Sequence, residues 1–382
     1  MTTINALGDI AAEFPLLPDI YYLNHAAVAP WPRRAVEAVK RFAEENAAMG
    51  ARRYDQWLRV EAALREQLRV LLNAHHVDDI ALLKNTSEGL SVVAHGLDWQ
   101  AGDNIVISNE EFPSNRIVWE SLRDQGVTVR EADISGDEPE SALMARVDEH
   151  TRMLAISSVQ YASGLRLDLQ RLGEFCRARR ILYCIDSIQS LGALPLDVQA
   201  FHADFVAADG HKWMLGPEGV AVFYCRDTLR EQLRLHQFGW HMLEHAGDFE
   251  RRAWQPARSA RRFECGSPNM LGIHALHASL SLLMELGMET VSRQVLDNTA
   301  LLLGRLGQSA RIELLTPTAS DRHAGIVTFR LRGDDPLRLW RYLSERNVIC
   351  ALRGGGVRLS PHFYNSNKEL ESVIELINEY RA

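Results

Sequence analysis

Short apolar runs alternate with segments of helical periodicity along the first two-thirds of the chain. Runs typical of buried strands occupy 80–84, 104–108, 152–160, 181–188, 205–208 and 220–224. Helices are predicted at 32–49, 54–73 and 168–179, and leucines recur at helical spacing on one face of the second helix, which we assign to the core. This alternation predicts an α/β domain with a largely parallel sheet.

The last third of the chain mixes helices and strands differently. A linking helix is expected at 269–288, followed by helices at 289–306, 336–346 and 367–381 and by strands at 311–315, 325–331 and 357–360. This mixture indicates a smaller α+β domain. We therefore expect an N-terminal arm at 1–20 that packs on the small domain, a large domain at 21–270, and the linker helix with the small domain at 271–382.

Polar residues at the ends of two apolar runs carry the candidate chemistry. Lys212 lies in the turn between the runs at 205–208 and 220–224, and Asp186 ends the run ILYCID. A lysine held partly out of water becomes a nucleophile towards carbonyl carbon, whereas the alternative is an ordinary loop lysine in solvent. A carboxylate at a strand end can keep a pyridine nitrogen protonated, so the pair suits pyridoxal 5'-phosphate (PLP).

The runs CIDSIQSLGALPLDV at 184–198 and DFVAADGHKWMLGPEG at 204–219 resemble the class V aminotransferase family of fold type I PLP enzymes. That family includes cysteine desulfurases, kynureninases and isopenicillin N epimerase. The likeness extends from YYLNHAAVAP at 21 to SPHFYNS at 360. It implies a large domain with a mainly parallel seven-stranded sheet and a Schiff base between PLP and Lys212.

The segment KNTSEGL at 84–90 is a candidate anion site. Free N–H groups at a helix start bind anions, although Thr86 or Ser87 at this point can also be a simple N-cap. The resemblance assigns the hydroxyls of Thr86 and Ser87 to the cofactor phosphate.

The resemblance also assigns residues around the cofactor ring. Phe112, in FPS, would stack on the ring, Gln189 would face its phenolic oxygen, and either Gln160 or Tyr161 would supply a further contact, of which we choose Tyr161. His211 is a candidate phosphate donor or a structural histidine of the lysine loop. We interpret His25 as a turn residue.

Asp209 departs from the family pattern, because many relatives have serine three residues before the lysine. A carboxylate facing a phosphate is repulsive. We therefore expect Asp209 to turn away and cap the tight turn at Gly210.

Further residues are assigned to the substrate and to a second subunit. Arg358 lies in a predicted strand, where a guanidinium can bind a carboxylate with two hydrogen bonds, and its position matches the family's substrate arginine. The motif RFECGSPN resembles the segment whose hydroxyl, here Ser267, completes the phosphate site of the neighbouring subunit. Trp240 lies in a long excursion that reaches the partner's site in the family. The resemblance therefore implies a homodimer with shared active sites.

Composition limits the other possibilities. The chain of 382 residues carries a formal net charge of −8, which argues against nucleic acid as a partner. Five scattered cysteines have no disulfide or metal-ligand spacing, so we expect no metal and a reducing, cytoplasmic setting. We see no signal peptide and no apolar run that is long enough to cross a membrane.

We therefore predict a PLP-dependent enzyme acting on an amino acid, either a lyase that cleaves C–S bonds or eliminates a β-substituent, or an aminotransferase. An epimerase similar to isopenicillin N epimerase and a non-catalytic PLP-binding module are the alternatives. Cys350 is expected to be a buried small hydrophobe, because the longer loop that carries a desulfurase nucleophile is absent before Arg358.

Overall fold

The computed structural model describes residues 10–381, and part of the predicted N-terminal arm therefore lies outside the described residues. A seven-stranded sheet with the order β2-β8-β7-β6-β5-β3-β4 forms the centre of the large domain. Its strands are Ile80–Leu83 (β2), Asn104–Ser108 (β3), Thr128–Ala132 (β4), Thr151–Ser157 (β5), Leu182–Asp186 (β6), Phe205–Asp209 (β7) and Ala221–Cys225 (β8). The pairs from β4 to β7 are parallel and β8 is antiparallel to both its neighbours. The predicted mainly parallel sheet is confirmed.

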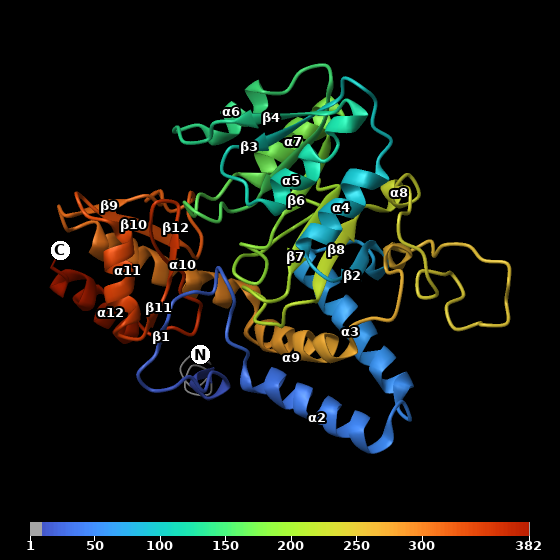
Figure 1. The fold of residues 1–382 in the computed structure, drawn as a ribbon, viewed down its shortest axis with the longest axis horizontal. Coiled ribbons are helices and arrows are strands. Elements are labelled where there is room, and N and C mark those ends of the chain that lie inside the picture. The colour runs from blue at the N-terminus through green and yellow to red at the C-terminus, as the bar shows by residue number, and fades with distance from the viewer. Residues whose placement is uncertain (1–9, 382) are drawn as a thin grey trace.

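Helices cover both faces of this sheet (Figure 1). Side chains of α3 (Tyr54–Leu72), α7 (Leu169–Arg179) and α9 (Met270–Leu286) form one apolar core with the sheet, and those of α4 (Thr86–Gly96) and α5 (Ser114–Glu120) form a second core on the other face. The long helix α2 (Arg33–Met49) packs along α9. The short helix α6 (Pro139–Ala145) lies between β4 and β5, and α8 (Asp227–Arg230) follows β8.

The small domain is built on an antiparallel sheet with the order β12-β13-β10-β9, formed by Ile312–Leu314 (β9), Val327–Leu331 (β10), Ala351–Arg353 (β12) and Gly356–Leu359 (β13). Helices α10 (Met288–Leu306), α11 (Pro336–Ser344) and α12 (Asn367–Glu379) share its apolar core. The strand β1 (Tyr21–Tyr22) pairs with β11 (Val348–Ile349), so residues 21–22 lie beside this domain.

The predicted linker helix is α9, and it ends at Gly287, where α10 begins at an angle of 87°. Within residues 10–381 no single helix is long and apolar enough to cross a membrane, and only the bent pair of α9 and α10 reaches the required length together.

The part of the arm that the structure describes contacts the loop before α12 in the small domain and the start of α2 in the large domain. The Phe14 ring stacks on Tyr364 at a centroid distance of 3.5 Å, and Glu13 accepts a hydrogen bond from the Arg34 guanidinium at 2.8 Å. Both contacts hold residues 13–14 against neighbouring elements.

Candidate active site

Lys212 lies in the turn that joins β7 to β8, as the sequence predicts. Its side chain is buried to 9% exposure, and the neighbouring Trp213 is fully buried, with its indole N–H donating to Gln189 Oε1 at 3.0 Å. A Cβ on Gly192, whose φ is +96°, would lie 2.4 Å from the Trp213 carbonyl oxygen. The turn is therefore packed tightly enough to keep Lys212 out of bulk water.

Asp186 lies at the carboxyl end of β6, next to β7, and is 2% exposed. Burial raises the pKa of its carboxyl group, a hydrogen bond from the Ile188 N–H opposes this, and the nearby charge of Glu111 raises the pKa further. Burial lowers the pKa of Lys212, and the charge of Asp186 acts in the opposite direction. The two groups are therefore within electrostatic reach of each other.

Glu111 is a buried carboxylate of this region that the sequence analysis missed. It accepts hydrogen bonds from the Ser157 N–H at 2.9 Å, from Ser108 Oγ at 2.8 Å and from the Asn115 amide at 2.8 Å. Burial raises the pKa of Glu111 in spite of these bonds. The signal in the sequence was an acidic residue three positions after the buried strand β3.

The Phe112 ring lies beside Lys212 and contacts the Tyr161 ring. The Lys212 Nζ atom is 5.7 Å from the centroid of the Phe112 ring, and the Tyr161 ring meets Phe112 edge to face at 5.1 Å. Gln160 is fully buried and its amide lies 3.4 Å from Glu111 Oε1. The structure therefore brings both Gln160 and Tyr161 to this region. Tyr161 contacts Phe112, and Gln160 contacts Glu111.

The start of α4 differs from the expectation in two respects. The N-cap is Asn85, whose side chain accepts from the Glu88 N–H, and not Thr86 or Ser87. The prediction that Asp209 caps the turn at Gly210 is wrong: its carboxylate accepts from the N–H and the hydroxyl of Thr86, at 2.9 and 3.1 Å. The carboxylate crosses to α4 because the helix start offers free N–H donors beside the end of β7.

Other polar groups surround this helix start. Ser87 Oγ donates to Ser114 Oγ at 2.9 Å, and His211 Nδ1 lies 3.7 Å from Asp209 Oδ1, too far for a hydrogen bond.

Gln189 donates its amide to the Ala26 carbonyl oxygen at 3.0 Å. His25 is a buried turn residue, with its Nδ1 atom 2.8 Å from the Ser360 carbonyl oxygen.

Arg358 reaches this region from strand β13 of the small domain. It is 2% exposed, and its guanidinium donates to the Tyr161 carbonyl oxygen at 2.7 Å. Burial, followed by the charge of Arg353, lowers the pKa of Arg358 to about 10. A buried guanidinium bound to a single neutral carbonyl is a strong candidate to bind an anion.

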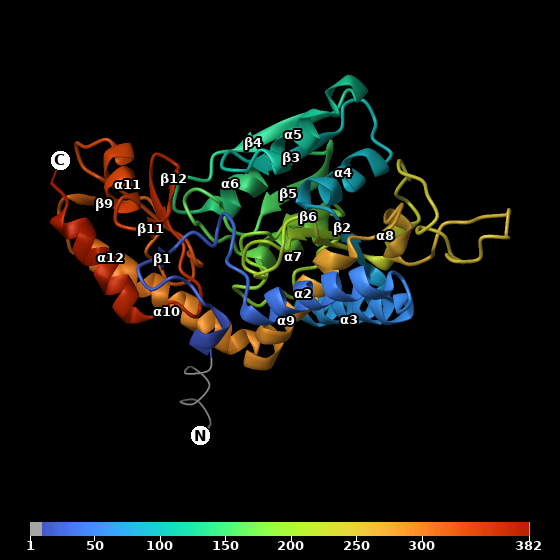
Figure 2. The same ribbon diagram turned by 60° about the horizontal axis from the view of Figure 1, so that its bottom comes forward.

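Ser267 and Trp240 lie apart from this group within one chain. The Trp240 indole N–H donates to Ser267 Oγ at 3.3 Å, and within residues 10–381 no hydrogen bond or ion pair joins either residue to Lys212, Asp186 or Arg358. Trp240 belongs to the segment 231–259, which extends from the body of the chain as a long excursion (Figures 1 and 2).

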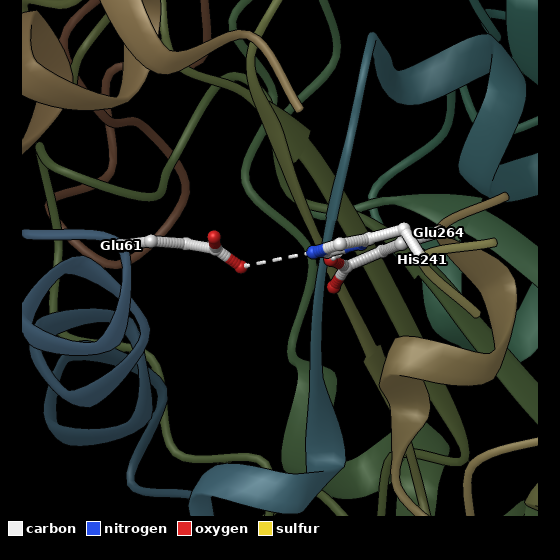
Figure 3. Close-up of side chains that lie close together, drawn as sticks. All are labelled: Glu61, His241 and Glu264. Atoms are coloured by element: carbon white, nitrogen blue, oxygen red, sulfur yellow. Dashed lines mark ion pairs between the residues drawn. The ribbon is translucent and has the colours of Figure 1, made fainter. Parts of the chain in front are cut away.

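The base of this excursion is attached to α3 by a buried cluster of Glu61, His241 and Glu264 (Figure 3). The Arg65 guanidinium donates to both carboxylates, to Glu61 at 2.7 Å and to Glu264 at 2.5 Å. Glu264 also accepts from the Leu82 N–H at 2.8 Å. Because Arg65 forms ion pairs with both carboxylates, we interpret the cluster as an ion-pair network that holds the excursion on the large domain.

The residues around Lys212 fit PLP. Three buried polar atoms here have no partner within residues 10–381, namely His211 Nδ1, Gln160 Oε1 and Arg358 Nε. Buried polar atoms are normally paired, so these atoms point to a ligand with polar groups of its own. When PLP is bound, His211 would contact the phosphate, Asp186 the pyridine nitrogen and Lys212 the aldehyde carbon.

Comparison with known proteins agrees with this assignment. The profile of the Aminotransferase class-V family matches residues 21–373. A probable cysteine desulfurase of Methanothermobacter thermautotrophicus is 31% identical, with 97% of each chain covered, and an uncharacterized aminotransferase, YcbU, of Bacillus subtilis is 28% identical over 78% of each.

Solved structures share the fold. An apo cysteine desulfurase from Thermococcus onnurineus gives a TM-score of 0.88 at 24% identity, with 97% of each chain covered. The cystine C–S lyase C-DES, in complex with its product cysteine persulfide, gives a TM-score of 0.88 at 23% identity, covering 96% of this chain and 99% of that one. The predicted fold is confirmed, and the chain belongs to the Aminotransferase class-V family of PLP-dependent enzymes.

Proposed function

We propose that the protein is a PLP-dependent lyase that cleaves the Cβ–S bond of a sulfur-containing L-amino acid. The observation that carries the proposal is the convergence of buried Lys212, Asp186 and Arg358, each from a different strand or turn, on one region beside Phe112. Relatives named cysteine desulfurase and a structural neighbour named a C–S lyase support sulfur amino acids as the substrate class.

PLP, when bound, supplies the carbonyl carbon to which the amino group of the substrate is joined, and a ring that takes up the electron pair left at Cα. Arg358 binds the α-carboxylate and thereby fixes the substrate on the small-domain side. Lys212 Nζ removes the proton from Cα, and burial helps because it lowers the pKa of this amine towards neutrality. Asp186 holds a proton on the pyridine nitrogen.

Loss of the Cα proton allows the Cβ–S bond to break with both electrons on sulfur. Addition of water then gives pyruvate and ammonia beside the released sulfur compound. A cysteine nucleophile is not part of this proposal, because burial raises the pKa of Cys350 to about 12 and keeps that thiol protonated. This distinguishes the proposed reaction from persulfide formation on the enzyme.

We also propose that the active enzyme is a homodimer in which Ser267 and Trp240 act on the partner's site. Support comes from the excursion at 231–259, which carries three exposed aromatic side chains, Phe238, Phe249 and Trp254, on an extension of the chain (Figure 2). Such side chains are favourable in protein interfaces.

All five cysteines are unpaired, which supports a cytoplasmic setting.

The test uses the purified holoenzyme with L-cystine, L-cysteine and S-substituted cysteines. Pyruvate, ammonia and a sulfur product in equal amounts are expected from at least one of them, and the Lys212→Ala protein should form none. Alanine as the amino-acid product would indicate a desulfurase, a racemised substrate an epimerase, and a keto acid that requires an amino acceptor an aminotransferase. Each of these outcomes would overturn the proposed elimination.

A further inference from the structure

The hairpin formed by β12 and β13 carries two arginines on one face. Arg358 pairs with Ala351, and Arg353 pairs with Gly356. Paired residues of an antiparallel ladder share a face, and residues two apart on one strand do so as well. Arg353 and Arg358 therefore lie on the same face, opposite to Val357, which enters the apolar core of the small domain.

This face lies against the large domain beside the candidate active site. The Thr328 hydroxyl, in the strand β10 next to β13, donates to the Ala162 carbonyl oxygen at 2.6 Å. The Arg358 guanidinium donates to the Tyr161 carbonyl oxygen. At the tip of the hairpin, a Cβ on Gly354 would lie 3.0 Å from Ala162 Cβ. The backbone of the tip is thus fixed beside Tyr161 and Ala162.

Arg353 has no acidic partner in this position. Its guanidinium donates to the neighbouring Leu352 carbonyl oxygen, and no carboxylate lies within ion-pair distance of it within residues 10–381. Arg353 is exposed, as is Arg330 on β10, but Arg330 pairs with Glu313 at 2.7 Å. The charge of Arg353 adds to burial in lowering the pKa of both Arg358 and Lys212. Its field therefore reaches both groups.

Two arginines on one face repel each other unless an anion lies between or beside them. We propose that Arg353 binds a second anionic group, at the far end of the substrate side chain, while Arg358 binds the α-carboxylate. The preferred substrate would then be a sulfur amino acid whose sulfur substituent ends in a carboxylate or a similar anion. This inference rests on the proposed function and specifies its substrate class.

The test compares S-carboxymethyl-L-cysteine with its amide, S-carbamoylmethyl-L-cysteine, because the two have nearly the same shape and differ in the charge of the distal group. Both kcat/KM and the Kd from changes in the absorbance of bound PLP are measured for the holoenzyme. We expect the acid to be preferred by about fivefold or more, as befits a partly exposed ion pair.

The Arg353→Gln variant should lose most of this preference. The constants for the amide should stay within about twofold, because the charge of Arg353 contributes less than burial to the pKa shifts of Arg358 and Lys212. Arg341→Gln is the matched control. Arg341 lies on α11, whose Leu339 and Leu343 pack with Val357 on the other face of the sheet, so this variant should retain the preference.

Equal constants for acid and amide in the wild-type protein, or a preference that survives in Arg353→Gln, would overturn the inference. A preference in Kd that Arg353→Gln abolishes would support the second anion site. If neither these compounds nor L-cystine or L-cysteine gave pyruvate, the same result would contradict the proposed lyase activity. The two proposals can therefore fail separately.

Discussion

The Asp209 carboxylate joins the end of β7 to the start of α4 through two hydrogen bonds from Thr86, one from its N–H and one from its hydroxyl. The Asp209 N–H in turn donates to the Thr86 hydroxyl at 3.0 Å. Asp209 lies three residues before Lys212. These bonds therefore connect the lysine turn directly to the start of α4, where Asp209 accepts from both donors of Thr86.

Replacement of Asp209 by alanine should destabilise the protein by about 1–3 kcal/mol, because it leaves the buried Thr86 N–H without an acceptor. Asp209→Asn keeps an acceptor oxygen and should recover most of the loss. Thermal unfolding of the holoenzyme measures both variants. A midpoint for Asp209→Ala equal to that of the wild type would show that these bonds contribute little.

Replacement of Arg358 by glutamine should reduce kcat/KM by about 100-fold or more, because a charge-assisted bidentate contact to the α-carboxylate is lost. Arg358→Lys keeps the charge but not the fork and should recover only part of the activity. Steady-state kinetics with the best substrate of the product assay measures the effect. A loss no larger than that of Arg341→Gln would exclude the substrate role.

A buried histidine should make stability depend on pH. His362 Nδ1 accepts from the Phe363 N–H and its Nε2–H donates to the Trp213 carbonyl oxygen, so the neutral ring is satisfied and a second proton has no acceptor. Burial lowers the pKa of His362 to about 4, although the hydrogen bond to the Trp213 carbonyl oxygen raises it. Between about pH 6.5 and pH 4 the unfolded chain therefore binds more protons at this site than the folded one.

Stability should consequently fall as the pH falls from about 6.5 towards 4, by up to about 3 kcal/mol from this residue. His362→Gln can retain a donor and an acceptor without titrating, and its stability should fall less over the same range. Unfolding midpoints in urea at several pH values measure the difference. Parallel pH curves for the two proteins would contradict the assignment.

Sharing of sites between subunits can be tested by complementation. Lys212→Ala lacks the base, and Ser267→Asp places a negative charge where the phosphate is expected to bind. If Ser267 serves the partner's site, a co-expressed heterodimer of the two variants contains one site with both intact residues. It should recover up to about half of the wild-type activity per dimer, as one of the two sites is complete.

The homodimers of each variant are the controls, and both should be inactive. An inactive heterodimer of confirmed composition, measured with the same substrate, would place Ser267 in the site of its own subunit. Sedimentation of the wild-type protein as a monomer under assay conditions would also contradict the shared site.

The sequence by itself determined most of the long elements and the position of Lys212 in a turn between two apolar strands. The strand β4 was not predicted. Apolar runs and helical periodicity are local signals, so the strands at 104–108 and 205–209 and the long helices were predicted to within a few residues. The pairing of Asp186 with Lys212 also followed, because parallel strands place their carboxyl ends at one edge of the sheet.

Only the tertiary structure decided which polar groups meet across distant segments. The bonds between Asp209 and Thr86 join residues 123 positions apart, and Glu111 takes its partners from β3, α5 and β5. The common face of Arg353 and Arg358 depends on the register of a hairpin, and a shift by one residue would reverse it. Such contacts depend on how distant elements pack together. The periodicity of apolar residues along the chain does not tell which of these residues meet.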